Sequence, residues 1–201
     1  MTYSKRIFDI ILAILLGLFL MPVLVITALV VLVIDGGPVF YISERMINPN
    51  KKFNLIKFRT MTTIKVDSGA SGGDKKNRIT STGAFLRRTR LDELPQLFNV
   101  LKGELSFVGP RPPLRQYVER FPSLYGTVLR SRPGITGLAS LMYHRHEERL
   151  LASANSPSET DDIYSRVCIP RKAKLDLIYQ RQSTMCWDIA IILKTAFRVL
   201  K

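Results

Sequence analysis

Two adjacent carboxylates, Asp92 and Glu93, are the side chains best suited to chemistry in this sequence. They directly follow the basic run Arg87-Arg88-Thr89-Arg90, in a chain with 30 Lys and Arg but only 16 Asp and Glu. Arginine can hold phosphate through parallel hydrogen bonds, and a carboxylate can attack phosphorus or hold a metal ion. The pattern therefore indicates a phosphate-handling site.

A structural role for the acidic pair is also open. The sequence predicts a helix from Asp92 to Lys102, with Pro95 in its first turn and Gly103 after its last residue. Asp is a preferred N-cap residue, so Asp92 could simply cap this helix. The helix dipole would favour a negative charge there in either case.

The composition suits one compact domain with an appendage. The chain has 201 residues and a net charge of +14, all of it in residues 41–201 because the charges in residues 1–40 cancel. Such a surface attracts nucleic acid, anionic lipid or nucleotide phosphates. Cys168 and Cys186 have no metal-binding or disulfide spacing, which favours a reducing compartment.

Residues 10–34 contain no charge and are long enough to cross a bilayer. Pro22 interrupts this run and should kink or break a helix. Basic residues flank both ends, whereas the positive-inside rule places them on one side of a membrane. A re-entrant helix over residues 1–35, broken near Pro22, satisfies both facts, and a kinked spanning helix is the alternative.

The remaining sequence predicts short strands and helices, and thus a mostly helical α+β fold. Short strands are expected at 39–42 and 53–58, joined by a turn at 48–50. A polar stretch at 62–82 is predicted to be a mobile loop. A helix is expected over 84–90, with Ser81 or Thr82 as its cap.

Two rigid loops and a C-terminal helix complete this prediction. Residues 109–113 form a Gly-Pro-Arg-Pro-Pro turn that would fix the guanidinium of Arg111, and the Arg111–Pro112 bond is a candidate for the cis form. The glycines of residues 132–137 would let backbone N–H groups approach a ligand. Residues 186–201 are amphipathic, as in a helix lying on a membrane surface or packed on the core.

Six motifs in this sequence resemble, in the same order, those of the monotopic phosphoglycosyl transferases of the bacterial sugar transferase family. They are Lys5-Arg6-x-x-Asp9, Lys57-Phe58-Arg59-Thr60-Met61, Arg78-Ile79-Thr80-x-x-Gly83-x-x-Leu86-Arg87, Leu91-Asp92-Glu93-Leu94-Pro95-Gln96-Leu97-x-Asn99-Val100, Ser106-Phe107-Val108-Gly109-Pro110-Arg111-Pro112 and Pro133-Gly134-Ile135-Thr136-Gly137-Leu138-Ala139.

The resemblance implies a minimal form of this family. Residues 1–35 would be the re-entrant membrane helix, and residues 36–201 a small catalytic domain with interfacial helices on the cytoplasmic face of a bacterial inner membrane. The implied reaction moves a phospho-sugar from a UDP-sugar to a membrane polyprenol (undecaprenyl) phosphate and releases UMP. This would be the first membrane step of glycoconjugate assembly.

The resemblance also implies roles for individual residues. Asp92 would attack the sugar-bearing phosphate and form a covalent aspartyl intermediate, with Glu93 as the second acid. Mg²⁺, bound by Asp92 and the diphosphate, would offset the negative charge that these groups share. The residues implied in substrate binding are Lys57, Arg59, Arg87, Arg111, Pro112, Pro133, Gly134, Thr136, Gly137, His144 and Arg145.

The chain departs from the family pattern in two places. Met21-Pro22 stands where members often have Ser-Pro, whose hydroxyl can satisfy a carbonyl freed at the helix break. After Ala139, His144 occupies the slot of a family arginine in an ungapped comparison, and Arg145 reaches it with a one-residue shift. Residues 140–180 therefore form a divergent region that we expect to contact the sugar.

Two other kinds of protein remain as alternatives. A membrane-anchored basic module that binds nucleic acid or anionic lipid explains the charge, but not the acidic pair or the rigid loops. A degenerate homologue acting as a scaffold is the second. We expect lipid, UDP-sugar and polyprenol phosphate as partners and no nucleic acid, and leave a homo-oligomer open. The sequence does not name the sugar or the pathway.

Overall fold

The protein is described by a computed structural model over residues 1–63 and 77–199. It is an α+β fold, mostly helical, with two small sheets in the described part of the chain, which confirms the predicted fold class. The elements in chain order are α1 Tyr3–Phe19, α2 Met21–Val30, η1 Val31–Asp35, β1 Phe40–Asn48, β2 Lys51–Phe58, α3 Ser81–Thr89, η3 Leu91–Glu93, α4 Gln96–Lys102, β3 Ser106–Val108, α5 Arg115–Arg120, α6 Pro122–Val128, β4 Gly134–Thr136, α7 Leu138–Ala152, α8 Pro157–Ile163, η4 Tyr164–Cys168, α9 Ile169–Gln182 and α10 Met185–Val199.

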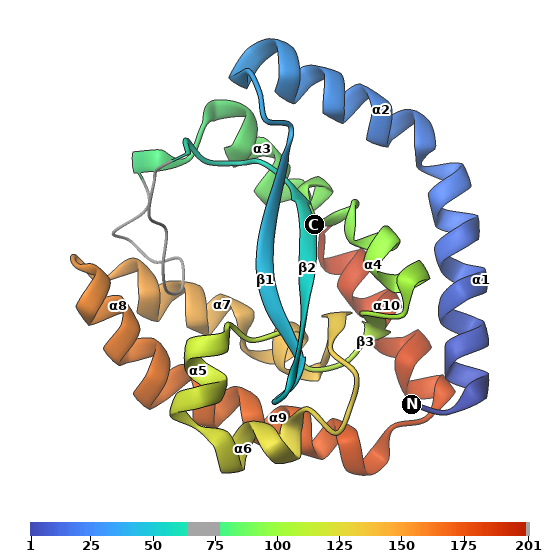
Figure 1. Cartoon of the computed structure of the whole chain (residues 1–201), viewed down its shortest axis with the longest axis vertical. Helices are drawn as coiled ribbons and strands as arrows, with labels where there is room; N and C mark the ends of the chain where they lie inside the picture. Colours follow the sequence, from blue (N-terminus) through green and yellow to red (C-terminus); the bar gives the residue numbers. More distant parts are fainter. Residues whose placement is uncertain (64–76, 200–201) are drawn as a thin grey trace.

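The first two helices form a bent arm along one side and over one end of the molecule (Figure 1). Among the described residues no single helix is long and apolar enough to cross a bilayer, but α1 and residues 21–35 meet that criterion together, with a bend of 60°. Pro22 lies in the first turn of α2, where a backbone N–H has no helical acceptor in any case. The break near Pro22 is thus confirmed, and Pro22 removes no hydrogen bond from α2.

The arm presents apolar side chains to its surroundings. Leu18, Phe19 and Val33 are 69%, 80% and 81% exposed, and most other large side chains of residues 7–34 are at least one-third exposed. Such a continuous apolar surface is unusual for a soluble monomer and marks an interaction site for a membrane or another protein. The model holds no bilayer, so the re-entrant arrangement stays a prediction.

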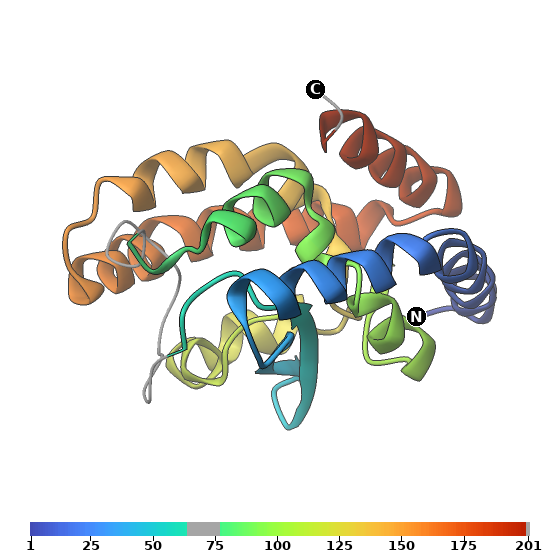
Figure 2. The ribbon, with the colours of Figure 1, turned by 90° about the horizontal axis from the view of Figure 1, so that it is seen from above.

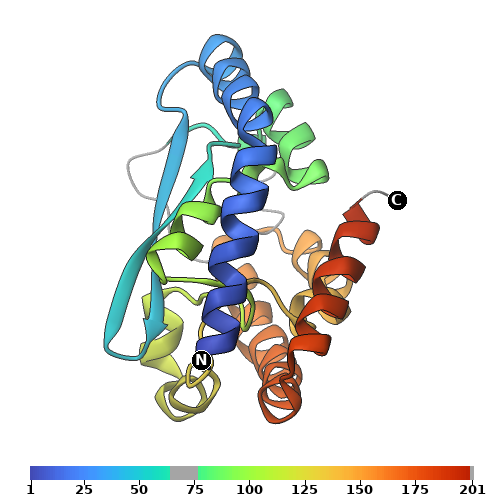
Figure 3. The same cartoon turned by 90° about the vertical axis from the view of Figure 1, so that its right-hand side faces the viewer.

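Polar side chains of the Lys5-Arg6-x-x-Asp9 motif fasten α1 to the rest of the protein. Lys5 Nζ pairs with Asp188 of α10, and Arg6 donates to the carbonyls of Val100 and Leu101 at the end of α4, at 2.6 and 2.8 Å. Asp9, fully buried, accepts from Phe107 N at 3.3 Å. Figure 3 shows α1 running alongside α4, with α10 on its other side.

The β1–β2 hairpin is the longer of the two sheets and confirms the predicted strands and turn, although both strands begin or end beyond the predicted limits. Helix α3 starts at Ser81, and its cap is Thr80, whose Oγ1 accepts from Gly83 N at 2.9 Å. The prediction of Ser81 or Thr82 as the cap was therefore wrong by one residue. The loop predicted over 62–82 lies for the most part outside the described residues.

The second sheet, β3 with β4, is parallel and was not predicted. It pairs Ser106 with Gly134 and Val108 with Thr136, and it continues into the close contact of Gly109 with Gly134 and Gly137. A Cβ on Gly134 would lie 2.2 Å from Gly109 N, and one on Gly137 would lie 2.1 Å from Gly109 O. These glycines therefore let two backbone segments touch, which replaces the predicted approach of a ligand.

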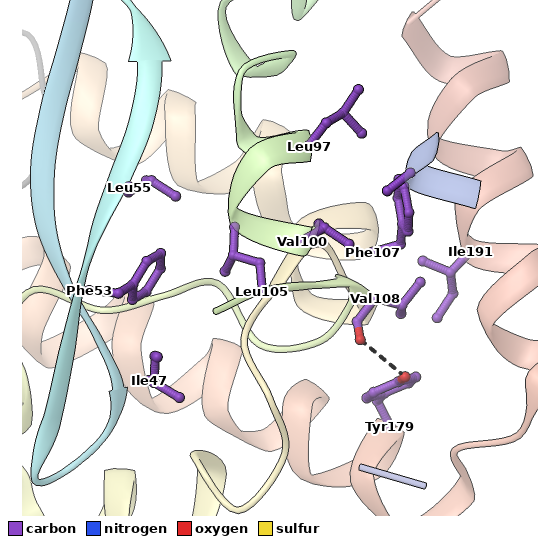
Figure 4. Packing of buried hydrophobic residues seen from close by; sticks show 11 residues of the cluster. Ile47, Phe53, Leu55, Leu97, Val100, Leu105, Phe107, Val108, Tyr179 and Ile191 are labelled. Carbon is purple, nitrogen blue, oxygen red and sulfur yellow. Dashed lines mark hydrogen bonds between the residues drawn. The ribbon is translucent and has the colours of Figure 1, made fainter. Parts of the chain in front are cut away.

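The main hydrophobic core surrounds this small sheet. Its buried members come from α1, the hairpin, α4, β3, α9 and α10, and include Phe53, Val100, Leu105, Val108 and Ile191. Figure 4 shows these side chains converging, with Tyr179 donating to the Val108 carbonyl at 3.4 Å. Leu91 of η3 packs in a separate, smaller cluster with Val31, Phe58 and Leu86.

Helix α10 carries both features that its sequence predicted. Ile191 and Asp188 are 3% and 2% exposed and pack on the core, whereas Leu193 and Phe197 are 51% and 65% exposed. Packing on the core is thereby confirmed. The outer apolar face is compatible with a membrane surface, which stays a prediction.

Replacing Gly134 by alanine should destabilise the protein, because its methyl group would overlap the backbone of Gly109. Overpacking of this kind costs about 1–3 kcal/mol, so the unfolding midpoint should fall by roughly 2–12 °C. Thermal unfolding in detergent measures it. Gly126→Ala in α6 is the matched control, since nothing lies within 4 Å of its new methyl group and its midpoint should not fall. Equal midpoints for both variants would contradict the packing role of Gly134.

Candidate active site

The acidic pair lies in a tight 3-10 turn between two helices. Arg90, at the end of α3, adopts the left-handed conformation with φ of 60°, and η3 follows at once. The amides of Glu93, Leu94 and Leu97 each bond a carbonyl three residues earlier, and α4 begins only at Gln96. The predicted helix start at Asp92 was therefore wrong, and Asp92 caps neither helix, because the left-handed Arg90 turns the chain before α4 begins.

One oxygen of Glu93 is the meeting point of three cations. Lys57 Nζ, Arg111 Nη2 and Arg90 Nη1 lie 2.7, 3.3 and 3.8 Å from Glu93 Oε1. Burial would raise the pKa of Glu93, but the charges of Lys57, Arg111 and Arg90 outweigh it and hold the pKa well below its usual range. Glu93 is therefore an ionised carboxylate at any physiological pH.

The hydrogen bonding and the pKa shift of Asp92 differ from those of Glu93. Asp92 is 7% exposed, and its buried Oδ1 has no hydrogen-bond partner among the described residues. Burial raises the pKa of Asp92 above its ordinary value, although the charge of Lys57 opposes this. An unpaired carboxylate oxygen inside a protein is costly, and such groups concentrate where chemistry is done.

A broad cleft of about 1520 Å³ opens over the acidic pair. It is larger than the usual pocket for one small ligand, which allows two substrates to lie in it together. Its apolar lining includes Leu16 of α1 and Leu20 at the bend of the arm. The cations that line it are Arg45, Lys57, Arg59, Arg78, Arg87, Arg88, Arg90, Arg111, Arg115, Arg145 and Arg198.

The structure brings several of the predicted substrate-binding residues into this cleft. Lys57 and Arg111 hold Glu93, and the positive charge of Arg87 acts on Asp92 while its Nε donates to Thr60 Oγ1 at 2.9 Å. Thr136 also lines the cleft and bonds the hydroxyl of Thr195 on α10 at 2.9 Å. The four predicted residues Lys57, Arg87, Arg111 and Thr136 come from four separate segments of the chain.

His144 and Arg145, the two candidates for the family's arginine slot, both line the cleft from α7. Arg90 Nη2 contacts His144 Nε2, which also lies 3.0 Å from Glu148 Oε1. Burial, followed by the charges of Arg90 and Arg111, lowers the pKa of His144 to about 3. His144 is therefore neutral near pH 7 and cannot replace the charge of an arginine, whereas Arg145 can.

The guanidinium of Arg59 donates its hydrogen bonds to backbone carbonyls and not to the acidic pair. Arg59 is 7% exposed, and its guanidinium donates to the carbonyls of Asp35, Gly36 and Gly37 at 2.6, 2.6 and 3.1 Å. Arg59 thus holds the end of the arm, since these carbonyls follow η1 directly. Its predicted contact with phosphate is not favoured by this geometry.

Four more of the predicted substrate-binding residues lie outside the lining of the cleft and support it indirectly. Pro112, Pro133, Gly134 and Gly137 are buried and do not line the cleft. The Arg111–Pro112 bond is trans, since Gly37–Pro38 is the cis bond of the described chain. These residues shape the two rigid loops, and the loops in turn hold Arg111 and Thr136 at the cleft.

Sequence reasoning missed Arg90, Glu147 and Tyr164 as residues of the site. Arg90 belongs to the basic run that directed attention to the acidic pair, so its position was a usable signal. Glu147 and Tyr164 line the cleft from the divergent region, where no motif marked them.

Comparison with known proteins places this architecture in a family. The model of the family described as bacterial sugar transferase matches residues 1–201, and the chain belongs to this family. It is 36% identical over 198 residues to a UDP-glucose:undecaprenyl-phosphate glucose-1-phosphate transferase of Klebsiella pneumoniae, covering 96% of this chain and 39% of that protein.

Other relatives are similar at the same level. The chain is 31% identical over 204 residues to a UDP-N-acetylgalactosamine-undecaprenyl-phosphate N-acetylgalactosaminephosphotransferase of Aeromonas hydrophila, covering 98% of this chain and 44% of that protein. A putative undecaprenyl-phosphate N-acetylgalactosaminyl 1-phosphate transferase of Bacillus subtilis is 44% identical over 119 residues, or 58% of this chain and 66% of its own length. The chain spans about two fifths of the length of the first two relatives.

Replacing Lys57 by methionine should raise the pKa of Asp92 further. The charge of Lys57 is the largest influence that lowers this pKa, and methionine keeps the bulk of the side chain but removes the charge. A ¹³C NMR titration of the Asp92 carboxyl carbon measures the shift. Lys52→Met is the matched control, because Lys52 lies on the same strand but pairs with the exposed Glu44. A pKa of Asp92 that stays constant or falls in Lys57→Met would refute this electrostatic coupling.

Proposed function

We propose that this protein transfers a phospho-sugar from a nucleoside diphosphate sugar to a polyprenol phosphate. The observation that carries the proposal is that Asp92, whose Oδ1 has no hydrogen-bond partner in the described part of the chain, lines a cationic cleft. Membership in the bacterial sugar transferase family and the names of the relatives support it.

In the first step a carboxylate oxygen of Asp92 attacks the sugar-bearing phosphorus. A bond forms between this oxygen and phosphorus, the bond to the bridging oxygen breaks, and the nucleoside monophosphate leaves with the electron pair. The product is an acyl phosphate that carries the sugar. In the second step an oxygen of the polyprenol phosphate attacks the same phosphorus, and Asp92 leaves as a carboxylate.

The cations of the cleft and Glu93 have different roles in this reaction. Lys57, Arg87 and Arg111 offset the charge of the diphosphate as the anionic nucleophile approaches it. The low pKa of Glu93 makes it a poor base, so we assign it the role of holding Lys57 and Arg111 in position. Arg59 is assigned to the end of the arm and not to the phosphates.

The residues fit Mg²⁺ only when the substrate shares in its coordination. Within residues 1–63 and 77–199 no three His, Cys, Asp or Glu side chains group as a metal site. Mg²⁺ commonly takes one or two carboxylates together with phosphates, and Asp92 offers a suitable free oxygen. Bound there, Mg²⁺ would neutralise charge on the diphosphate.

The arm provides the path by which the second substrate, a lipid phosphate, reaches the site. We assign residues 1–35 to a re-entrant membrane segment and residues 36–201 to a catalytic domain on the cytoplasmic face of a bacterial inner membrane. The bend of the arm contributes Leu16 and Leu20 to the cleft that contains Asp92, so the apolar chain of a lipid phosphate has a path to the site. The relatives are named for undecaprenyl phosphate, which supports this acceptor.

The donor is proposed as a UDP-sugar, with UMP as the product. Two relatives are named for UDP-linked donors, but their sugars are glucose and N-acetylgalactosamine. The comparisons therefore do not select one sugar.

Replacing Asp92 by asparagine should abolish the reaction, because an amide is no nucleophile toward phosphorus. The rate of UMP release from a UDP-sugar with undecaprenyl phosphate should fall by about a thousandfold or more. Intact-protein mass spectrometry without acceptor should show a phospho-sugar adduct on wild type and none on the variant. Asp162→Asn, which removes an exposed carboxylate of α8, should behave as wild type. Full activity of Asp92→Asn would exclude the nucleophile assignment.

The re-entrant arrangement predicts that both ends of the arm lie on the same side of the membrane. Thr2→Cys and Phe40→Cys, each in a background where the exposed Cys186 is serine, should both resist a membrane-impermeant thiol reagent added to intact cells. Both should react after the membrane is opened. Labelling of just one position in intact cells would demonstrate a spanning helix.

A further inference from the structure

One face of α7 forms a wall of the cleft. The residues of this helix that line the cleft recur with the spacing of a single helical face: Ser140, Leu141, His144, Arg145, Glu147, Glu148, Leu151 and Ala152. Figure 2 shows α7 and α9 side by side, away from α2. This wall lies in the region where the sequence departs from the family motifs.

Glu147 is held rigidly within that wall. Its Oε1 accepts from Lys172 Nζ at 2.9 Å, and the two side chains are only 16% and 10% exposed. Lys172 comes from α9 and is itself placed by Tyr164, whose ring centroid is 5.1 Å and whose hydroxyl is 3.4 Å from the ammonium nitrogen. Within the described chain nothing donates to Glu147 Oε2, which leaves an immobilised acceptor at the cleft.

The charge of Glu147 determines which part of a substrate can lie beside it. Phosphates are drawn to the cations around the acidic pair, and a carboxylate repels them. A neutral ring with several hydroxyl groups has the opposite property, because each hydroxyl can donate to a carboxylate oxygen. Hydrogen bonds to a charged acceptor are also stronger than those between neutral groups.

Glu147 also lines the same cleft as Arg111 and the acidic pair. Arg111 contacts Glu93 directly, and the pKa of Arg111 is raised first by Glu93 and also by Glu147, so the arginine lies in the fields of both carboxylates. A sugar is bonded directly to the phosphate that Asp92 would attack. The sugar is thus the hydroxyl-rich group nearest to the reacting phosphorus.

We propose that Glu147 selects the sugar of the donor by accepting hydrogen bonds from its hydroxyl groups. Lys172 acts as a positioning residue, because it fixes the carboxylate without reaching the substrate itself. This inference rests on the proposed function and names the residue that sets the substrate class, which is a neutral sugar with free hydroxyls facing α7.

The test compares donors that differ by one hydroxyl. UMP release is measured with undecaprenyl phosphate and a panel of UDP-sugars, and kcat/KM of the best donor is then compared with those of its single-deoxy analogues. Wild type should discriminate against at least one analogue by about tenfold or more, since that analogue leaves Glu147 unpaired. In Glu147→Gln the ratio of kcat/KM between the best donor and that analogue should fall to within about threefold.

Two further variants separate recognition from stability. Lys172→Met keeps the carboxylate but removes its support, so it should lower the same ratio while a deoxy analogue that wild type tolerates stays unaffected. Asp162→Asn, which breaks the exposed ion pair with Arg166 in the same region, should leave every ratio as in wild type. Inhibition by UMP serves as a check of folding and should be equal in all proteins.

The results of this test distinguish failure of the inference about Glu147 from failure of the proposed function. An unchanged ratio in an active Glu147→Gln protein overturns the inference and leaves the proposed function intact. Weakened UMP inhibition in that variant, with unchanged discrimination between sugars, would assign Glu147 to the nucleoside and also overturn it. Absence of turnover by wild type with every donor would instead remove the proposed function, together with this inference.

Discussion

The site depends on the convergence of three cations on a single oxygen of Glu93. Lys57 lies on β2, Arg90 at the end of α3 and Arg111 in the turn after β3, so one carboxylate joins three separate segments of the chain. Without that negative charge the cations would repel one another in a partly buried space. Asp92 beside it keeps Oδ1 without a hydrogen-bond partner among residues 1–63 and 77–199.

A second set of polar contacts fixes the arm relative to this cluster. Lys5, Arg6 and Asp9 hold one end to α10, α4 and β3, and Arg59 holds the carbonyls at the other end. Both ends of the arm are thus attached to the part of the protein that carries the acidic pair.

The sequence allowed prediction of the fold class, the hairpin and the broken arm, because each has a local signal. Arg59, Gly134 and Gly137 were predicted to bind substrate; in the structure Arg59 bonds backbone carbonyls and the two glycines contact the backbone of Gly109. An arginine suits a phosphate or a carbonyl, and a glycine admits a ligand or another strand. The choice depends on chain segments far away, such as β3 against β4. The left-handed Arg90 likewise carries no local mark, and it displaced the expected helix start.

The ion pair of Lys5 and Asp188 joins residues 183 positions apart in the chain. At ordinary rates of translation this separation corresponds to roughly 10–35 seconds between the synthesis of the two partners. During that interval α1 has neither its ionic partner nor the surface of α10, and its apolar side chains must be covered by something else. A lipid surface that receives the nascent arm early would protect it from aggregation, and docking of α10 would then complete the tertiary structure. The sequence separation of this ion pair thus sets an order in time for the assembly of the protein.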